Sequence, residues 1–170
     1  GGVMATPRIN ITAKQLHEVY KRDGRCDHYI ELRKYFGFNH LWAKRFAGFA
    51  NGSVENINVG LKLELTFAEI HEQLKRRRNL PTLAYLVNAG ETFDEAVETY
   101  DFFRYNPSAY SIYGVYRRRG VSREKLYETI ESAKGFTIDT NDLVRMCFDC
   151  DILVIDAIEA TGARIGSLEV

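Results

Sequence analysis

The fold is decided by the stretch Asn106-Pro-Ser-Ala-Tyr-Ser-Ile-Tyr-Gly-Val-Tyr-Arg-Arg-Arg-Gly-Val-Ser-Arg-Glu-Lys-Leu-Tyr127. Asn106 is a favourable N-cap and Pro107 suits the first helical position, so a helix is predicted to begin here. Apolar residues then recur at the helical spacing i, i+3, i+4, which predicts one buried face. These residues are Ile112, Val115 and Tyr116.

The end of this helix is basic. Arg117, Arg118 and Arg119 crowd the last turn, where the helix dipole favours cations. Gly120 is predicted to end the helix, and Ser122 to cap a second helix that begins with acidic and then apolar residues. The unit is therefore a capped helix with a basic end, a glycine, and a second helix.

Two earlier stretches follow the same plan, Asn79–Ala96 and Asn39–Ile57. Each begins on Asn, reaches Gly after about a dozen residues, and restarts at Ser or Thr with an acidic residue behind it. Three such stretches indicate an internal repeat of a helical pair. The alternative is that they are ordinary helix ends without a repeat.

Further helix starts are marked by capping boxes at Thr12–Gln15, Thr66–Glu69 and Thr92–Glu95. The first box predicts a helix to about Arg22 with Leu16, Val19 and Tyr20 buried.

Between this helix and the Asn39 helix, Asp27 is predicted to cap another one, and Gly37-Phe38 to form a tight turn. The Asn39 helix is expected to bury Leu41, Trp42, Phe46 and Phe49. A helix, a tight turn and a second helix form the helix-turn-helix pattern of DNA-binding proteins. We therefore predict an all-α protein with tandem helix-turn-helix units over residues 10–134.

Residues 135–162 are predicted to form a C-terminal packing or dimerisation helix, capped at Asp139, Thr140 or Asn141. Its apolar seam steps by 3 and 4, at Leu143, Cys147, Cys150, Val154, Ala157 and Thr161. Such a helix must pack against the body or against a second copy. A strand at residues 152–155 is the alternative.

The bulk composition fits a folded domain. The chain has 170 residues, of which 45% are hydrophobic and 27% charged. No apolar run approaches about 18 residues and no signal-peptide pattern opens the chain, so we expect an intracellular protein that does not enter a membrane. Residues 1–130 hold 20 Lys and Arg against 15 Asp and Glu, whereas residues 131–170 hold 3 against 8. A basic body with an acidic end suits a polyanion-binding part joined to a part with another role.

Basic clusters at helix ends and polar residues at helix starts are the candidate DNA contacts. Arginine binds phosphates and guanine edges, and base contacts usually come from the start of a recognition helix. The candidates are Asn39, His40, Lys44, Arg45, Arg76, Arg77, Arg78, Asn79, Thr82, Asn106, Ser108, Ser111, Arg117, Arg118 and Arg119. The alternative is that each cluster is a solvated helix end.

Gly90-Glu-Thr-Phe-Asp-Glu-Ala96 and Gly120-Val-Ser-Arg-Glu-Lys-Leu126 resemble the G-W-S-x-x-E-A tail of the DNA-binding repeats in phage-type homing endonucleases. Glu91 and Val121 stand where that family prefers Trp. The resemblance spans about residues 27–130 and implies a sequence-specific reader of double-stranded DNA. We find no His-Asn-His or GIY-YIG nuclease pattern, so the expected role is transcriptional repression of phage or mobile-element type, without catalysis and without a cofactor. Besides DNA, the expected partner is a second copy of the chain, which would form a homodimer through the C-terminal helix.

Three alternatives are kept. Cys147 and Cys150, with Cys26 and His28, could supply four zinc ligands, although buried thiols on an apolar seam are common. A protein–protein adaptor or phage-encoded inhibitor would use the aromatic surface. A metal-dependent nuclease would use carboxylates near the C-terminus, at Asp139, Asp142, Asp149, Asp151, Asp156 and Glu159.

Overall fold

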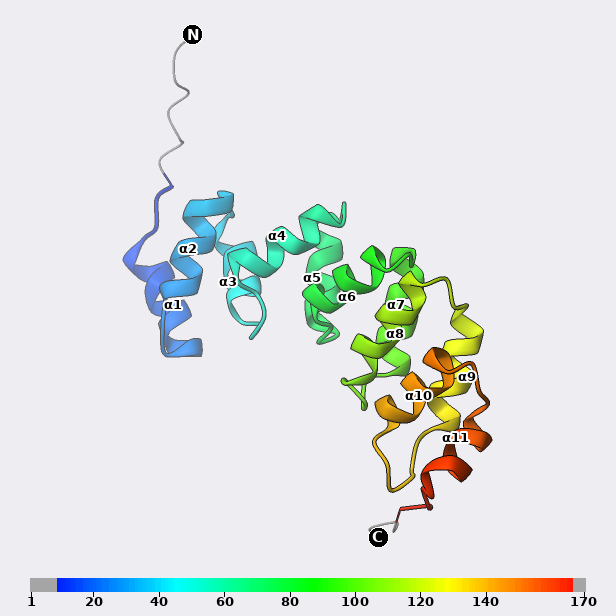
Figure 1. The fold of residues 1–170 in the computed structure, drawn as a ribbon. Coiled ribbons are helices and arrows are strands. Elements are labelled where there is room, and N and C mark those ends of the chain that lie inside the picture. The colour runs from blue at the N-terminus through cyan, green and yellow to red at the C-terminus, as the bar shows by residue number, and fades with distance from the viewer. Residues whose placement is uncertain (1–8, 167–170) are drawn as a thin grey trace. The chain divides into compact units, whose positions relative to one another are not determined.

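The computed structural model describes residues 9–166 and confirms the all-α class. Within this range there are eleven helices and no strand, apart from one isolated bridge between Phe136 and Ile165. The helices, shown in Figure 1, are α1 Ala13–Asp23, α2 Asp27–Phe36, α3 His40–Ala47, α4 Val54–Lys62, α5 Phe67–Lys75, α6 Leu80–Asn88, α7 Phe93–Phe102, α8 Ala109–Arg118, α9 Arg123–Ser132, α10 Thr140–Asp149 and α11 Val154–Thr161.

Most connections share one backbone design. A residue in the left-handed conformation follows the helix, the next residue turns inward, and the third caps the following helix. The inward residue donates its N–H to the carbonyl five residues earlier, as Glu91 does to Leu86 (3.2 Å) and Val121 to Tyr116 (3.1 Å). This bond defines the Schellman motif, which satisfies carbonyls left open at a helix end. The left-handed residues of the turns with this bond are Glu64, Arg77, Gly90, Gly120 and Asp151. Gly24 and Gly37 end α1 and α2 in the same left-handed conformation.

The N-caps recur with a short period. All three predicted capping boxes form, with both reciprocal hydrogen bonds present at Thr12, Thr66 and Thr92. From Thr12 to Thr92 the helices begin every 13 or 14 residues, at positions 12, 26, 39, 53, 66, 79 and 92. The chain is thus a series of short helices joined by tight turns. The α2 cap is Cys26 rather than the predicted Asp27, which is the first helical residue.

The chain divides into two compact units, with the boundary between Ala84 and Tyr85 inside α6. We call residues 1–84 unit 1 and residues 85–170 unit 2. Unit 1 has 14 Lys and Arg against 8 Asp and Glu, a net charge of +6. Unit 2 has 9 against 15, a net charge of −6. The difference in net charge is therefore larger between these units than between residues 1–130 and residues 131–170, which have net charges of +5 and −5.

The core of unit 1 is built around the tight turn between α2 and α3. Phe38, the inward residue of that turn, stacks on Phe46 of α3 with ring centroids 5.2 Å apart. It also meets Phe67 of α5 edge-on at 4.8 Å. Phe46 is fully buried, and Trp42 also stacks on it at 5.5 Å. The turn and the start of α3 are therefore held by aromatic packing.

In unit 2, α10 packs against α8, α9 and α11. The predicted single C-terminal helix is wrong, because the chain turns at Asp151, which has φ 52°, and α11 folds back along α10. Asp adopts the left-handed conformation more readily than most residues. The turn lets Ala157 of α11 become fully buried with Leu143 of α10. The strand alternative for residues 152–155 is also wrong, since α11 begins at Val154.

Cys150 of the predicted C-terminal seam is exposed, and so are three residues predicted to be buried in other helices. Tyr20, Leu41 and Val115 lie at 59%, 53% and 37% relative exposure. Each belongs to a helix whose inward face is narrower than the apolar pattern suggested. The predicted start of the Asn106 helix is also displaced, because residues 107–108 form a turn and α8 begins at Ala109.

Candidate nucleic-acid interface

The first turns of α3 are tied to α1 through Glu18. Lys44 Nζ and His40 Nε2 each lie 2.6 Å from a Glu18 carboxylate oxygen. Because a carboxylate only accepts, Nε2 of His40 donates in this bond. His40 Nδ1 is hydrogen-bonded to the Tyr29 hydroxyl at 2.7 Å, and Arg33 donates to the same hydroxyl at 2.7 Å. Two predicted DNA contacts, His40 and Lys44, thus also fix α3 against α1 and α2.

Of the predicted DNA contacts at α3, only Arg45 therefore lies on the exposed face of the helix without a structural role in its cap or its packing. Asn39 uses its side chain to cap α3, accepting from Trp42 N–H at 2.9 Å. Leu41 and Arg45, four residues apart on one face, are exposed. Arg45 lies over the Trp42 ring at 5.9 Å. This face offers one aliphatic side chain and one guanidinium to a ligand.

The Glu18 contacts predict a dependence of stability on acid. The hydrogen bond from Lys44, followed by that from His40, lowers the pKa of Glu18 to about 2 from its ordinary 4.5. Stabilisation is therefore complete above pH 4.5 and is lost as the pH falls towards 2, because the unfolded carboxylate protonates first. We expect the unfolding free energy of the Glu18→Gln variant to change less with pH in this range than that of the native chain. Denaturant titrations at several pH values measure this, and parallel pH profiles would contradict it.

The second basic cluster lies between α5 and α6, and its residues have unlike environments. Lys75 and Arg77 are exposed and line a groove of about 530 Å³ with the loop at Gly48–Asn51. Arg76 pairs with Glu72 at 2.8 Å. Arg78 is buried as the inward residue of its turn and donates to Gln73 at 3.0 Å.

The start of α6 is organised by its own cap. The Asn79 side chain accepts from the Thr82 N–H at 2.9 Å and the Thr82 hydroxyl at 3.1 Å. Both predicted contact residues therefore stabilise the helix start.

The third cluster belongs to unit 2 and is largely paired with acids. Arg117 Nε lies 3.2 Å from Glu91, and Arg119 Nη1 lies 3.1 Å from Asp149. Arg118 is exposed and lies over the Tyr85 ring at 4.8 Å. Of the three arginines, only Arg118 has no carboxylate within ion-pair distance among residues 9–166.

Glu91 is the centre of a buried polar network that the sequence did not reveal. Its side chain is fully buried and accepts from Tyr113, Arg117 and Arg123. Arg123 also donates to Thr99 Oγ1 at 3.2 Å. Burial raises the pKa of Tyr113 to about 12, so its hydroxyl stays protonated and donates. The hydrogen bonds and ion pairs of this network hold the turn after α6 against α8 and α9.

The remaining predicted contacts lie near the start of α8. Asn106 accepts from the Ser108 hydroxyl at 3.0 Å, and Ser111 accepts through its carbonyl from Tyr85 at 3.0 Å. Ser108 and Ser111 are exposed. Of the fifteen candidates, nine belong to unit 1 and six to unit 2.

The residues considered for metal binding have unlike environments. Cys147 is buried, Cys150 is exposed, and Cys26 donates to the Leu16 carbonyl at 3.2 Å. Asp139 caps α10, while Asp149 accepts from Tyr116 at 2.8 Å and pairs with Arg119. Over residues 9–166 no group of three His, Cys, Asp or Glu side chains is arranged to hold a metal ion.

Similarity to known proteins gives no family for this chain. No protein-family model matches it, and neither a curated protein nor a solved structure shows detectable similarity. In the part of the chain that the structure describes, no helix combines the length and apolar character needed to cross a membrane.

Proposed function

We propose that this protein binds double-stranded DNA through unit 1 and acts as a repressor-type regulator. The observation that carries the proposal is the net charge of +6 on unit 1, against −6 on unit 2. Phosphate contacts supply most of the affinity of DNA-binding proteins, so a basic unit is the expected contact surface. Exposed cations occur on each of α1 to α5, at Lys14, Lys21, Lys34, Arg45, Lys62 and Lys75.

The α3 helix is the proposed reading element. The order α2, tight turn, α3 is that of a helix-turn-helix, in which the second helix enters the major groove. The exposed pair on α3 fits this role, because arginine recognises guanine edges and an aliphatic side chain can contact the thymine methyl. We therefore assign base contacts to Leu41 and Arg45, and phosphate contacts to cations such as Lys75.

The test uses the full chain and a pool of random duplexes, selected over several rounds at two salt concentrations without added metal. We expect an enriched motif. Arg45→Ala should weaken binding to the selected duplex about tenfold and relax its sequence preference. Lys75→Ala should weaken binding to all duplexes and reduce the salt slope by about 0.9. Fluorescence anisotropy with labelled duplexes measures both.

Arg118→Ala is the matched control, because it removes an exposed arginine from the acidic unit. It should leave affinity within about twofold of the native value. Retention of no duplex at low salt would overturn the proposal, and a larger loss in Arg118→Ala than in Arg45→Ala would move the interface to unit 2. A homodimer through residues 135–162 stays a prediction, and sedimentation analysis of the full chain decides it.

A further inference from the structure

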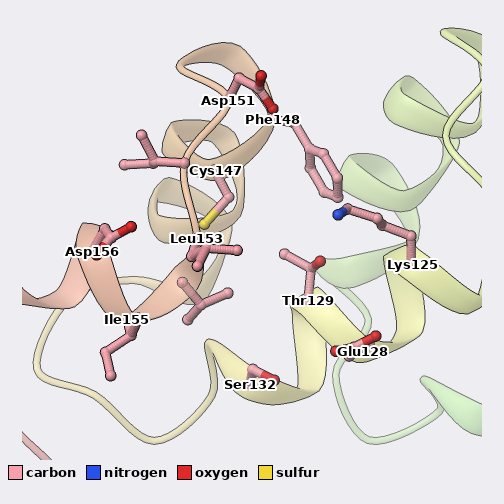
Figure 2. Close-up of a pocket in the computed structure, with 12 residues that line it drawn as sticks. Lys125, Glu128, Thr129, Ser132, Cys147, Phe148, Asp151, Leu153, Ile155 and Asp156 are labelled. Carbon is pink, nitrogen blue, oxygen red and sulfur yellow. The ribbon is translucent and has the colours of Figure 1, made fainter.

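Unit 2 contains a groove that the proposed DNA contact does not use. It has a volume of about 490 Å³ and lies between α9 on one side and the end of α10 with the start of α11 on the other (Figure 2). The α9 wall consists of one helical face, at Lys125, Glu128, Thr129 and Ser132. The opposite wall contains four consecutive aliphatic residues, 152–155.

Two aliphatic side chains of the apolar wall are largely exposed to solvent. Leu153 and Ile155 are 65% and 61% exposed. Thr129 and Cys147, on opposite sides of the groove in Figure 2, are nearly buried. Exposed aliphatic side chains beside a groove mark an interaction surface more often than isolated surface residues do.

The charges around the groove select the occupant. Glu128, Asp151 and Asp156 line it and are exposed, and no cation among residues 9–166 forms an ion pair with them. Lys125 is the one cation among the residues that line the groove. Three carboxylates against one ammonium, on a unit with net charge −6, repel nucleic acid and anionic lipid. A symmetric dimer through this face would also bring the two acidic rims together.

We infer that this groove binds an amphipathic, cationic segment of a partner protein. Aliphatic side chains of the segment enter between α9 and α11, and its Lys or Arg side chains meet Glu128, Asp151 and Asp156. This is the helix-in-groove mode of peptide recognition, in which the groove supplies apolar contacts and the rim supplies charge selection. The inference does not depend on DNA binding by unit 1.

The test measures binding of a fluorescein-labelled helical peptide of about 14 Leu and Lys residues to the full chain at 150 mM salt. A Leu and Glu peptide of the same length and pattern is the charge control. We expect the Leu/Lys peptide to bind at least about tenfold more tightly than the Leu/Glu peptide. The double variant Leu153→Ser, Ile155→Ser should weaken binding about tenfold or more, and Asp151→Asn with Asp156→Asn severalfold.

The matched controls remove the same chemistry away from the groove. Ile165→Ser replaces an exposed aliphatic residue and Glu159→Gln an exposed acid, and neither lines the groove. Both variants should bind the peptide as the native chain does, and so should Arg45→Ala of unit 1. The inference is overturned if the Leu/Lys peptide does not bind, or if the control variants weaken binding as much as the groove variants. It is also overturned if Leu153→Ser converts a dimer into a monomer, because the occupant is then a second copy.

Discussion

Replacing Glu91 by Ala is expected to lower the free energy of unfolding by about 3–5 kcal/mol, because it leaves buried guanidinium groups without their carboxylate. The Glu91 side chain is fully buried, and the side chains of Arg123 and Arg117 are 10% and 23% exposed. Small domains have a total stability of only about 5–15 kcal/mol. Chemical denaturation of the full chain, followed by circular dichroism, measures the loss.

Glu124→Ala is the control for this prediction, since Glu124 is an exposed acid on the same helix as Arg123. Its effect should stay within about 0.5 kcal/mol. A double-mutant cycle between Glu91→Ala and Arg123→Ala should show that the two losses are far from additive. If Glu91→Ala lowers the free energy of unfolding by less than about 1 kcal/mol, the Glu91 carboxylate of the native chain is solvated by water and not by the two arginines.

The helix starts with a capping box could be predicted from sequence because each box is encoded within four residues. The three capping boxes at Thr12, Thr66 and Thr92 have both hydrogen bonds in the structure. The turn glycines are equally local signals, as Gly37 and Gly120 adopt positive φ. The turns at Glu64 and Arg77 were harder to predict, because residues other than glycine occupy the left-handed position there. Their conformation depends on the following cap and on the packing of the inward residue.

The partners of charged side chains could not be predicted from sequence. Arg117 and Arg119 stand together at a helix end, and their acids lie 26 and 30 residues away along the chain. The basic cluster therefore resembled a solvent-facing surface, although two of its three residues form ion pairs within unit 2. Glu91 and Val121 show a related effect. Each follows a left-handed glycine and donates its N–H to the carbonyl five residues earlier, yet one turn has an acid at this place and the other an aliphatic residue.

Gly52→Ala is expected to cost about 3 kcal/mol or more in stability, because a methyl group at this position overlaps backbone. A Cβ on Gly52 would lie 2.8 Å from the carbonyl carbon of Phe46 and would overlap its oxygen. Neither atom can move as a flexible side chain does, since Phe46 belongs to α3 and is fully buried. Relief requires the connection from α3 to Ser53, the cap of α4, to shift as a whole.

Gly24→Ala separates this steric effect from the general cost of losing a glycine. Gly24 has φ 73° and open space around its Cβ position, so the substitution should cost only about 1–2 kcal/mol for the left-handed conformation. Thermal and denaturant unfolding of both variants make the comparison, and equal losses would show that the α3–α4 connection is pliable. Because α3 carries the proposed reading face, DNA binding at a temperature where Gly52→Ala remains folded should also weaken, whereas peptide binding by unit 2 should persist.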